Sequence, residues 1–195
     1  MFNDVSSPLS LLLTRRSGKA RDMVAPGPNQ EQMAAILAAA ARTPDHGKLA
    51  PWRFVMVASD QRDALASLII DAYRAERPEA GRLEIEAMDQ FARQAPALVV
   101  MLFSPREASK IPLWEQELSC GAAGMNLLQA THATGFVGCW LTGWAAYDET
   151  VRDAFGTAPE RIAGFFFLGS PSRALDERPR PAPVAVISKW TPPSG

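Results

Sequence analysis

The chain has 195 residues, of which 47% are hydrophobic, and it carries 20 Lys and Arg against 21 Asp and Glu. A chain of this length can form one well-filled hydrophobic core but is short for two domains, so we expect a single domain over residues 1–195. With a formal charge of −1, the protein has no overall positive potential that would attract nucleic acid or anionic membranes. No apolar run approaches the roughly 20 residues of a membrane helix. The two cysteines and two histidines lack the spacing of a zinc set or a disulfide framework, which predicts no metal site and a reducing, cytoplasmic setting.

The patterns along the chain predict alternating helices and strands. Ser7 before Pro8 fits the N-cap and first position of a short helix. Asn29, with Gln32 three residues later, predicts a capping box and a helix to about Ala41. Apolar periodicity and breakers predict a helix that contains Leu65, Leu68, Ile69 and Ala72 and ends at the RPEAGR segment, residues 77–82. They also predict helices over 83–94, 112–134 and 147–156, and strands over 54–58, 97–103, 138–143 and 162–171.

Two features point to packing beyond local neighbours. The segment 112–134 is small and apolar almost all round, and its Gly121 and Gly124 each cost about 1 kcal/mol of helix propensity, so something should pack closely against them. The tail from Pro171 is proline-rich, yet residues 184–190, VAVISKW, have the β-branched character of a strand. We expect this strand to pair outside its neighbourhood, for example with another subunit.

Arg15, Arg16 and Ser17 form the first candidate binding group. Two guanidinium forks and a hydroxyl suit phosphate or ribose-type oxygens. The alternative is a solvated helix end whose basic residues favour the macrodipole.

The segment RTPDHGKLAPWRF, residues 42–54, is the second candidate. His46 follows Asp45 and is a candidate proton donor, although such pairs also make turn and capping hydrogen bonds. The tryptophans at 52, 114, 140 and 144 suit either the wall of a flat ligand or an ordinary core. Cys120 is expected to pack in the core, and His132 to lie at the surface or in a last helical turn.

These segments occur in a recognisable order: RRS, RTPDHGKLAPWRF, PLWEQELSCGAAGMNLLQA, GFVGCWLTG and GFFFLGSP. In this order, from about Leu9 to the final strand, the chain resembles the nitroreductase family of FMN-dependent oxidoreductases, closest to its small, minimal branch. The resemblance implies an α+β fold with a central, mostly antiparallel sheet flanked by helices. It also implies an intertwined homodimer with close packing at Gly121 and Gly124, a C-terminal extension of about 171–195 that exchanges its strand, and two FMN molecules at the interface.

The resemblance also implies roles for individual residues. Arg15, Arg16 and Ser17 would hold the FMN phosphate and ribityl oxygens, and Lys19 would lie near the N1 and O2 edge of the flavin. Arg42 and His46 would reach the flavin of the other subunit. Trp140, Leu141 and Thr142 would line the isoalloxazine with backbone N–H groups. A stretch proposed for nicotinamide contact in the family corresponds to Ala130, Thr131, His132, Ala133, Thr134 and Gly135.

The implied activity is ping-pong electron transfer from NADH or NADPH to FMN and then to a small-molecule acceptor such as a nitroaromatic or a quinone. Lys48 and Ala50 stand where many relatives have Asn and Gln, and Leu141 stands where the closest branch tends to have arginine. These departures motivate one alternative, a flavin-binding protein without turnover. Another alternative is a specialised enzyme that fragments its own flavin or removes halogen from an aromatic substrate. The preferred nicotinamide nucleotide and the physiological acceptor stay open.

Overall fold

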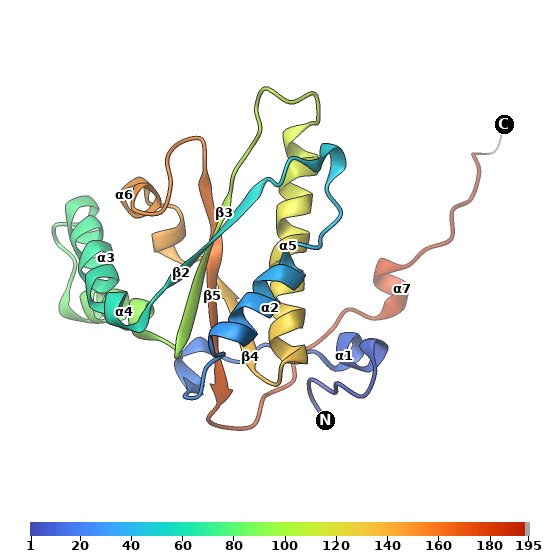
Figure 1. Cartoon of the computed structure of the whole chain (residues 1–195), viewed down its shortest axis with the longest axis horizontal. Helices are drawn as coiled ribbons and strands as arrows, with labels where there is room; N and C mark the ends of the chain where they lie inside the picture. The colour runs from blue at the N-terminus through green and yellow to red at the C-terminus, as the bar shows by residue number, and fades with distance from the viewer. Residues whose placement is uncertain (194–195) are drawn as a thin grey trace.

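The structure is a computed structural model, and it describes residues 1–193 (Figure 1). Its helices are α1 (Pro8–Thr14), α2 (Gln30–Ala40), α3 (Arg62–Glu76), α4 (Arg82–Arg93), α5 (Leu113–Ala133), α6 (Glu149–Asp153) and α7 (Pro183–Val186). Its strands are β1 (Met23–Val24), β2 (Trp52–Val57), β3 (Ala97–Phe103), β4 (Val137–Leu141) and β5 (Arg161–Pro171). Among the described residues, no helix is both long and apolar enough to cross a bilayer.

Local capping explains where the first two helices begin. The Ser7 side chain accepts a hydrogen bond from the backbone N–H of Ser10, and Pro8 is the first residue of α1. At α2, Asn29 Oδ1 accepts the Gln32 N–H at 2.8 Å, while Gln32 Oε1 accepts the Asn29 N–H at 3.0 Å. Both caps were predicted and are confirmed, since side chains satisfy N–H groups that have no partner within the helix.

The sheet is antiparallel in every pairing that the structure describes, which confirms the expected α+β class. The strand order is β1-β5-β3-β2, and β4 also pairs with β5. β4 lies beside residues 165–169 of β5, so the first residues of β5 have no strand on that side. This gap in the sheet edge provides the room for the site described below.

Two hydrophobic cores cover the two faces of the sheet. Because side chains alternate along a strand, Phe165 and Phe167 join a core with α3 and α4, whereas Phe166 and Leu168 join a core with α2 and α5. Figure 1 shows the same layers, with α3 and α4 on one side of the sheet and α2 and α5 on the other.

Gly124 packs closely within its own chain, as the cost of a glycine inside this helix predicts, and packing of the two glycines between subunits stays a prediction. A Cβ at this position would lie 3.0 Å from the rings of Phe166 and Trp140. A Cβ at Gly121 would meet no heavy atom of residues 1–193 within 4 Å. The two glycines of α5 therefore have different surroundings: Gly124 faces closely packed rings, and Gly121 faces open space.

The predicted strand over 184–190 was wrong for this chain. Pro183–Val186 form one helical turn, and no strand follows it up to residue 193. Val184 and Trp190 are 86% and 81% exposed, and Figure 1 shows the segment projecting away from the body. A strand needs a neighbour for its backbone groups, and the described chain places none beside this segment. Exchange of the tail between subunits stays a prediction.

Candidate functional site

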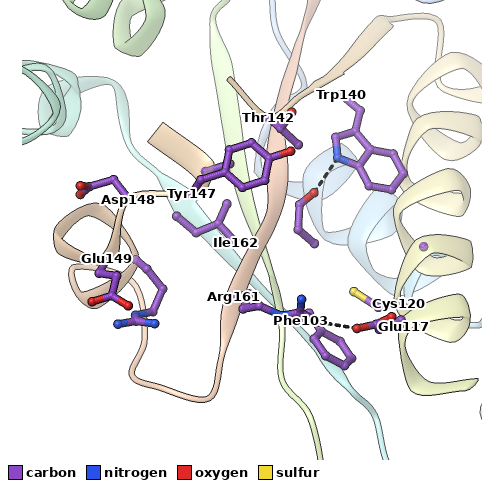
Figure 2. A pocket seen from close by; sticks show the side chains of 14 residues that line it. Phe103, Glu117, Cys120, Trp140, Thr142, Tyr147, Asp148, Glu149, Arg161 and Ile162 are labelled. Carbon is purple, nitrogen blue, oxygen red and sulfur yellow. Dashed lines mark hydrogen bonds and ion pairs between the residues drawn. The ribbon is translucent and has the colours of Figure 1, made fainter. Parts of the chain in front are cut away.

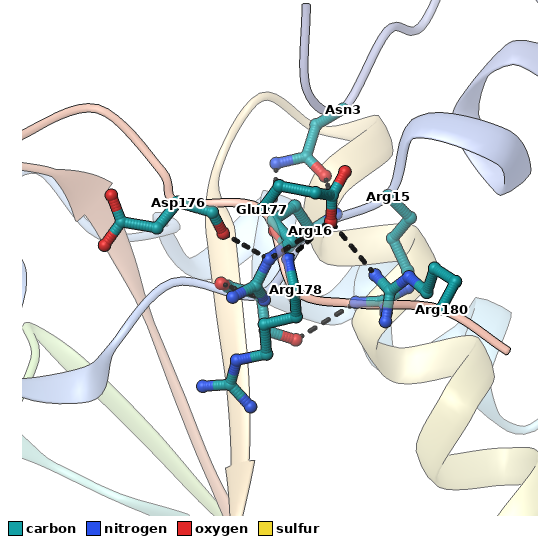
Figure 3. Close-up of polar contacts among 8 residues, drawn as sticks. Asn3, Arg15, Arg16, Asp176, Glu177, Arg178 and Arg180 are labelled. Atoms are coloured by element: carbon teal, nitrogen blue, oxygen red, sulfur yellow. Dashed lines mark hydrogen bonds and ion pairs between the residues drawn. The ribbon is translucent and has the colours of Figure 1, made fainter.

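Four arginines meet where the end of α1 contacts the segment after β5 (Figure 3). Arg16 is only 5% exposed, and its Nε donates to the carbonyl oxygen of Asp176 at 2.6 Å. Arg15 Nη1 donates to Ser17 Oγ at 3.0 Å. The other two arginines are Arg178 and Arg180, which the sequence reasoning missed. The signal available was the RPRP step in the tail, two basic residues on one side of an extended chain.

The electrostatics of this arginine cluster favour an anion. Burial lowers the pKa of Arg15, and the charges of Arg180 and Arg16 lower it further. Burial also lowers the pKa of Arg16, with Arg178 and Arg180 adding to the effect. Like charges held together at a partly buried position are stabilised by an opposite charge, and guanidinium forks match the oxygens of a phosphate.

Lys19 belongs to the same end of the molecule. Its Nζ lies 3.5 Å from Asp176 Oδ2, and Lys19, Arg16 and Ser17 line a small pocket that also touches Val137, the first residue of β4. The arginine cluster therefore lies beside the beginning of β4.

β4 is an edge strand, since in the described part of the chain it pairs only with β5. Its outer backbone groups are therefore available to a ligand. The Trp140 side chain is fixed in place, because its Nε1 donates to the carbonyl oxygen of Ala163 at 2.9 Å and its ring lies 4.9 Å from that of Phe166. Leu141 packs against the core on the α3 and α4 side. Of the predicted group of Trp140, Leu141 and Thr142, the backbone is the best placed to contact a ligand.

A cavity of about 520 Å³ opens at the other end of β4, within the size range of small-molecule sites (Figure 2). Residues from α5, β4, β5 and the segment around α6 line it, among them Gly121, Trp140, Thr142, Tyr147 and Arg161. The Arg161 guanidinium lies over the Phe103 ring, 5.0 Å from its centroid, and pairs with Glu117. Flat aromatic walls with a few charged groups suit a planar molecule with polar substituents.

Cys120 also borders the cavity but is only 3% exposed, as its expected packing role requires. Burial raises the pKa of its thiol to about 12. The thiol is therefore neutral and unsuited to nucleophilic chemistry.

The loop after α2 is attached to α5 by hydrogen bonds. Ser119 Oγ donates to the carbonyl oxygen of Pro44 at 2.7 Å, and Asn126 Nδ2 donates to Thr43 Oγ1 at 2.9 Å. Within the loop, Asp45 Oδ2 accepts the Ala50 N–H at 2.7 Å. These contacts hold the loop that carries Arg42 and His46 in a defined place.

Lys48 and Ala50 both have positive φ, 55° and 46°. Residues other than glycine rarely take this conformation, so the loop has strained backbone at the two positions where the family resemblance predicts a departure from many relatives.

His46 lies apart from the cavity of its own chain. Its Nδ1 is 2.8 Å from Glu115 Oε2, and its side chain is 66% exposed. At 100° per residue, the α5 residues that contact the loop, Glu115, Ser119 and Asn126, lie on one face of the helix. Glu117 and Gly121, which line the cavity, lie on the opposite face. One chain therefore brings the arginine cluster, β4 and the cavity together and places His46 on the other face of α5, while Arg42 lies just after α2 at the start of the same loop.

The stretch 130–135 offers few groups to a nucleotide. Thr131 and His132 are 0% and 1% exposed, and of the two positions expected for His132, the surface or a last helical turn, the structure shows the last turn of α5. Thr134 Oγ1 donates to the carbonyl oxygens of Ala130 and Thr131. Ala133 and Gly135 are exposed. Contact of this stretch with nicotinamide nucleotide stays a prediction.

Comparison with known proteins decides the family. The model of the nitroreductase family matches residues 12–170, which covers most of the chain. The chain belongs to the nitroreductase family. Among curated relatives of this nitroreductase, it is 34% identical over 164 residues to the "Putative NAD(P)H nitroreductase YdjA" of Escherichia coli (strain K12), covering 84% of this chain and 87% of the relative.

Solved structures share the fold of this nitroreductase. A nitroreductase-like family protein from Bacillus cereus has a TM-score of 0.79 at 18% identity, covering 95% of this chain and 96% of that one. A nitroreductase from Desulfovibrio desulfuricans, crystallised in complex with FMN, has a TM-score of 0.71 at 22% identity, covering 96% and 99%. These identities establish the shared architecture and nothing finer.

Proposed function

We propose that this nitroreductase is an oxidoreductase that binds FMN along β4 and transfers electrons in a ping-pong cycle from NADH or NADPH to a small aromatic acceptor. The observation that carries the proposal is the layout around β4. An arginine cluster lies at its first residue, its outer backbone edge is free, and an aromatic cavity opens at its end. Five strand residues span about 16 Å, so the layout suits an elongated ligand with an anionic tail and a flat ring.

The residues present fit FMN at each part. Arg15, Arg180 and Ser17 would hold the phosphate, since positive charge predominates where the four arginines meet. Backbone N–H groups of residues 140–142 would meet the ring edge, and the open space at Gly121 leaves room beside it. The names of relatives agree, since one is called an NAD(P)H nitroreductase and another was crystallised with FMN.

We infer further that the working unit is a homodimer. His46 cannot reach the cavity of its own chain, because it contacts Glu115 on the opposite face of α5, and Arg42 belongs to the same loop. A second copy would supply them. The surface carries apolar side chains that a partner would cover: Leu9, Leu12, Leu13, Trp114, Leu118, Val184, Ile187 and Trp190, each at least 54% exposed. Exposed apolar side chains of this kind are typical of subunit interfaces.

Bound FMN supplies the hydride chemistry, and the chain binds, orients and stabilises charge. The arginine cluster would neutralise the phosphate, and Lys19 would add positive charge near the ring. His46, oriented by Glu115, would provide a proton to the acceptor bound in the partner's cavity. Trp140, Tyr147 and Phe103 would position a flat acceptor and exclude water from one side of it.

An absorption spectrum followed by anaerobic titration with each nicotinamide nucleotide tests the proposal. We expect a yellow protein whose flavin absorbance is bleached by NADH or NADPH and restored by a quinone or nitroaromatic compound. A protein that binds no FMN, or whose bound FMN neither nucleotide reduces, would contradict it. Sedimentation at micromolar concentration should give a dimer, and a monomer would contradict the shared site.

A further inference from the structure

The arginine cluster already contains an anion of its own, Glu177 (Figure 3). Its Oε1 lies 3.9 Å from Arg16 Nε and 3.8 Å from Arg180 Nη2, and it accepts the backbone N–H of Arg178 at 2.8 Å. One carboxylate thus touches or faces three of the four arginines from the same segment of tail.

The contacts of Glu177 with the guanidinium groups are loose. Charge-assisted N–H···O bonds measure about 2.7 to 2.9 Å, whereas both ion pairs of Glu177 are about 1 Å longer. Its side chain is 62% exposed. By contrast, Arg16 is held firmly, since its Nε and Nη1 donate to the carbonyl oxygens of Asp176 and Ser17 at 2.6 and 3.0 Å. Arg16 is therefore fixed by backbone contacts, and Glu177 is not needed to fix it.

The charge balance of the cluster also indicates that Glu177 is a poor match for the four arginines. Within residues 1–193, Arg15 and Arg178 have no carboxylate within 4.0 Å, and Asp176 directs its carboxylate to Lys19 rather than to the arginines. A carboxylate carries one negative charge, whereas a phosphate monoester carries about 1.5 to 2 at pH 7. A phosphate would therefore match the cluster better than Glu177 does.

We propose that Glu177 is a built-in competitor for the phosphate subsite, which it must leave when a phosphate monoester binds. This inference rests on the proposed function, and it makes Glu177 a determinant of cofactor affinity. The carboxylate stabilises the cluster in the ligand-free protein and repels the incoming dianion. It thereby lowers the affinity of the site for the phosphate of FMN and leaves the contacts of the flavin ring unchanged.

The test compares the full-length wild-type chain, stripped of flavin, with Glu177→Gln. Glutamine keeps the size and the hydrogen bond to the Arg178 N–H but removes the charge. Inorganic phosphate is the first probe, and its affinity is read from the rise of the unfolding temperature with concentration. We expect Glu177→Gln to bind phosphate about 5-fold more tightly, the size of a partly exposed ion pair. Glu86→Gln, which removes a surface carboxylate paired with Arg82, is the matched control and should change nothing.

FMN and riboflavin are the second pair of probes, with dissociation constants read from flavin fluorescence. FMN should bind Glu177→Gln about 5-fold more tightly, while riboflavin, which lacks the phosphate, should bind both proteins equally. Equal or weaker phosphate binding by Glu177→Gln would overturn the proposal, as would the same gain for riboflavin. If phosphate binding behaves as expected but no flavin binds, the proposed function fails and the role of Glu177 stands.

Discussion

The imidazole of His46 and the carboxylate of Glu115 are joined by a 2.8 Å contact between Nδ1 and Oε2, across 69 residues of sequence. A carboxylate only accepts at neutral pH, so Nδ1 carries the hydrogen. The contact therefore holds Nδ1–H toward Glu115 and directs Nε2 outward from a side chain that is 66% exposed, and the ring can donate a proton from Nε2 when both of its nitrogens carry hydrogen. In the homodimer proposed above, that nitrogen would face the partner's cavity.

Replacement of Glu115 by Gln should slow the acceptor step by about 10-fold, because the amide can also donate to Nδ1 and no longer holds one tautomer. Flavin content and the rate of flavin reduction by NADH or NADPH should not change. Stopped-flow measurement of the two half-reactions separates these effects. Glu115→Gln should cause no further loss in a His46→Asn background, and fully additive losses would show that Glu115 does not act through His46.

Arg15 and Arg180 should each contribute a charge-assisted contact to the phosphate. Arg15→Ala or Arg180→Ala should raise the dissociation constant of FMN by about 10- to 150-fold, which corresponds to 1.5 to 3 kcal/mol. Equilibrium titration by flavin fluorescence measures this change. Double replacement of Arg15 and Arg16 should release FMN altogether, although Arg16 also holds the tail through Asp176. Arg82→Ala, on the exposed face of α4, is the control. Stoichiometric FMN in the double variant would refute the site.

The two glycines of α5 provide a matched pair. Gly124→Ala should destabilise the protein by about 1 to 3 kcal/mol, because the new Cβ would lie 3.0 Å from the rings of Phe166 and Trp140. Gly121→Ala meets no atom of its own chain within 4 Å and should stabilise the helix by up to about 1 kcal/mol. Urea unfolding measures both changes. If Gly121 lies against a partner subunit, Gly121→Ala should weaken the dimer in sedimentation, and loss of stability without dissociation would contradict that placement.

Most of the fold could be predicted because its signals are local. The capping box at Asn29, the periodicity of Leu65 and Ile69, and the apolar run of β5 each depend on neighbours in sequence. The tail was predicted incorrectly because β propensity reports a side chain that suits a sheet, not the presence of a strand to pair with. Pro183 and the lack of a neighbour in the described chain favour a helical turn instead.

The candidate site was harder to predict, because it is assembled from distant segments. Arg15 and Arg16 stood out as a pair, but Arg178 and Arg180 join them only through the return of the tail after β5. Nothing near His46 in sequence indicates Glu115 as its partner. His132 was predicted at the surface or in a last helical turn, and its burial comes from packing that the sequence does not show, since α5 contacts both α1 and β4 and His132 is 1% exposed.

Buried His132 should make the protein sensitive to acid. Burial lowers the pKa of its imidazole from 6.5 to about 4, with a further contribution from Arg15. Below pH 6.5 the unfolded chain binds a proton at His132 that the folded chain does not bind, so the free energy of unfolding falls as the pH decreases towards 4. The loss between pH 7 and pH 5 should be about 2 kcal/mol from this group alone. His132→Leu should show a correspondingly smaller loss over the same range, whatever its stability at pH 7. Urea unfolding of both proteins at pH 7 and pH 5 measures the difference, and equal losses would show that His132 is protonated in the folded state.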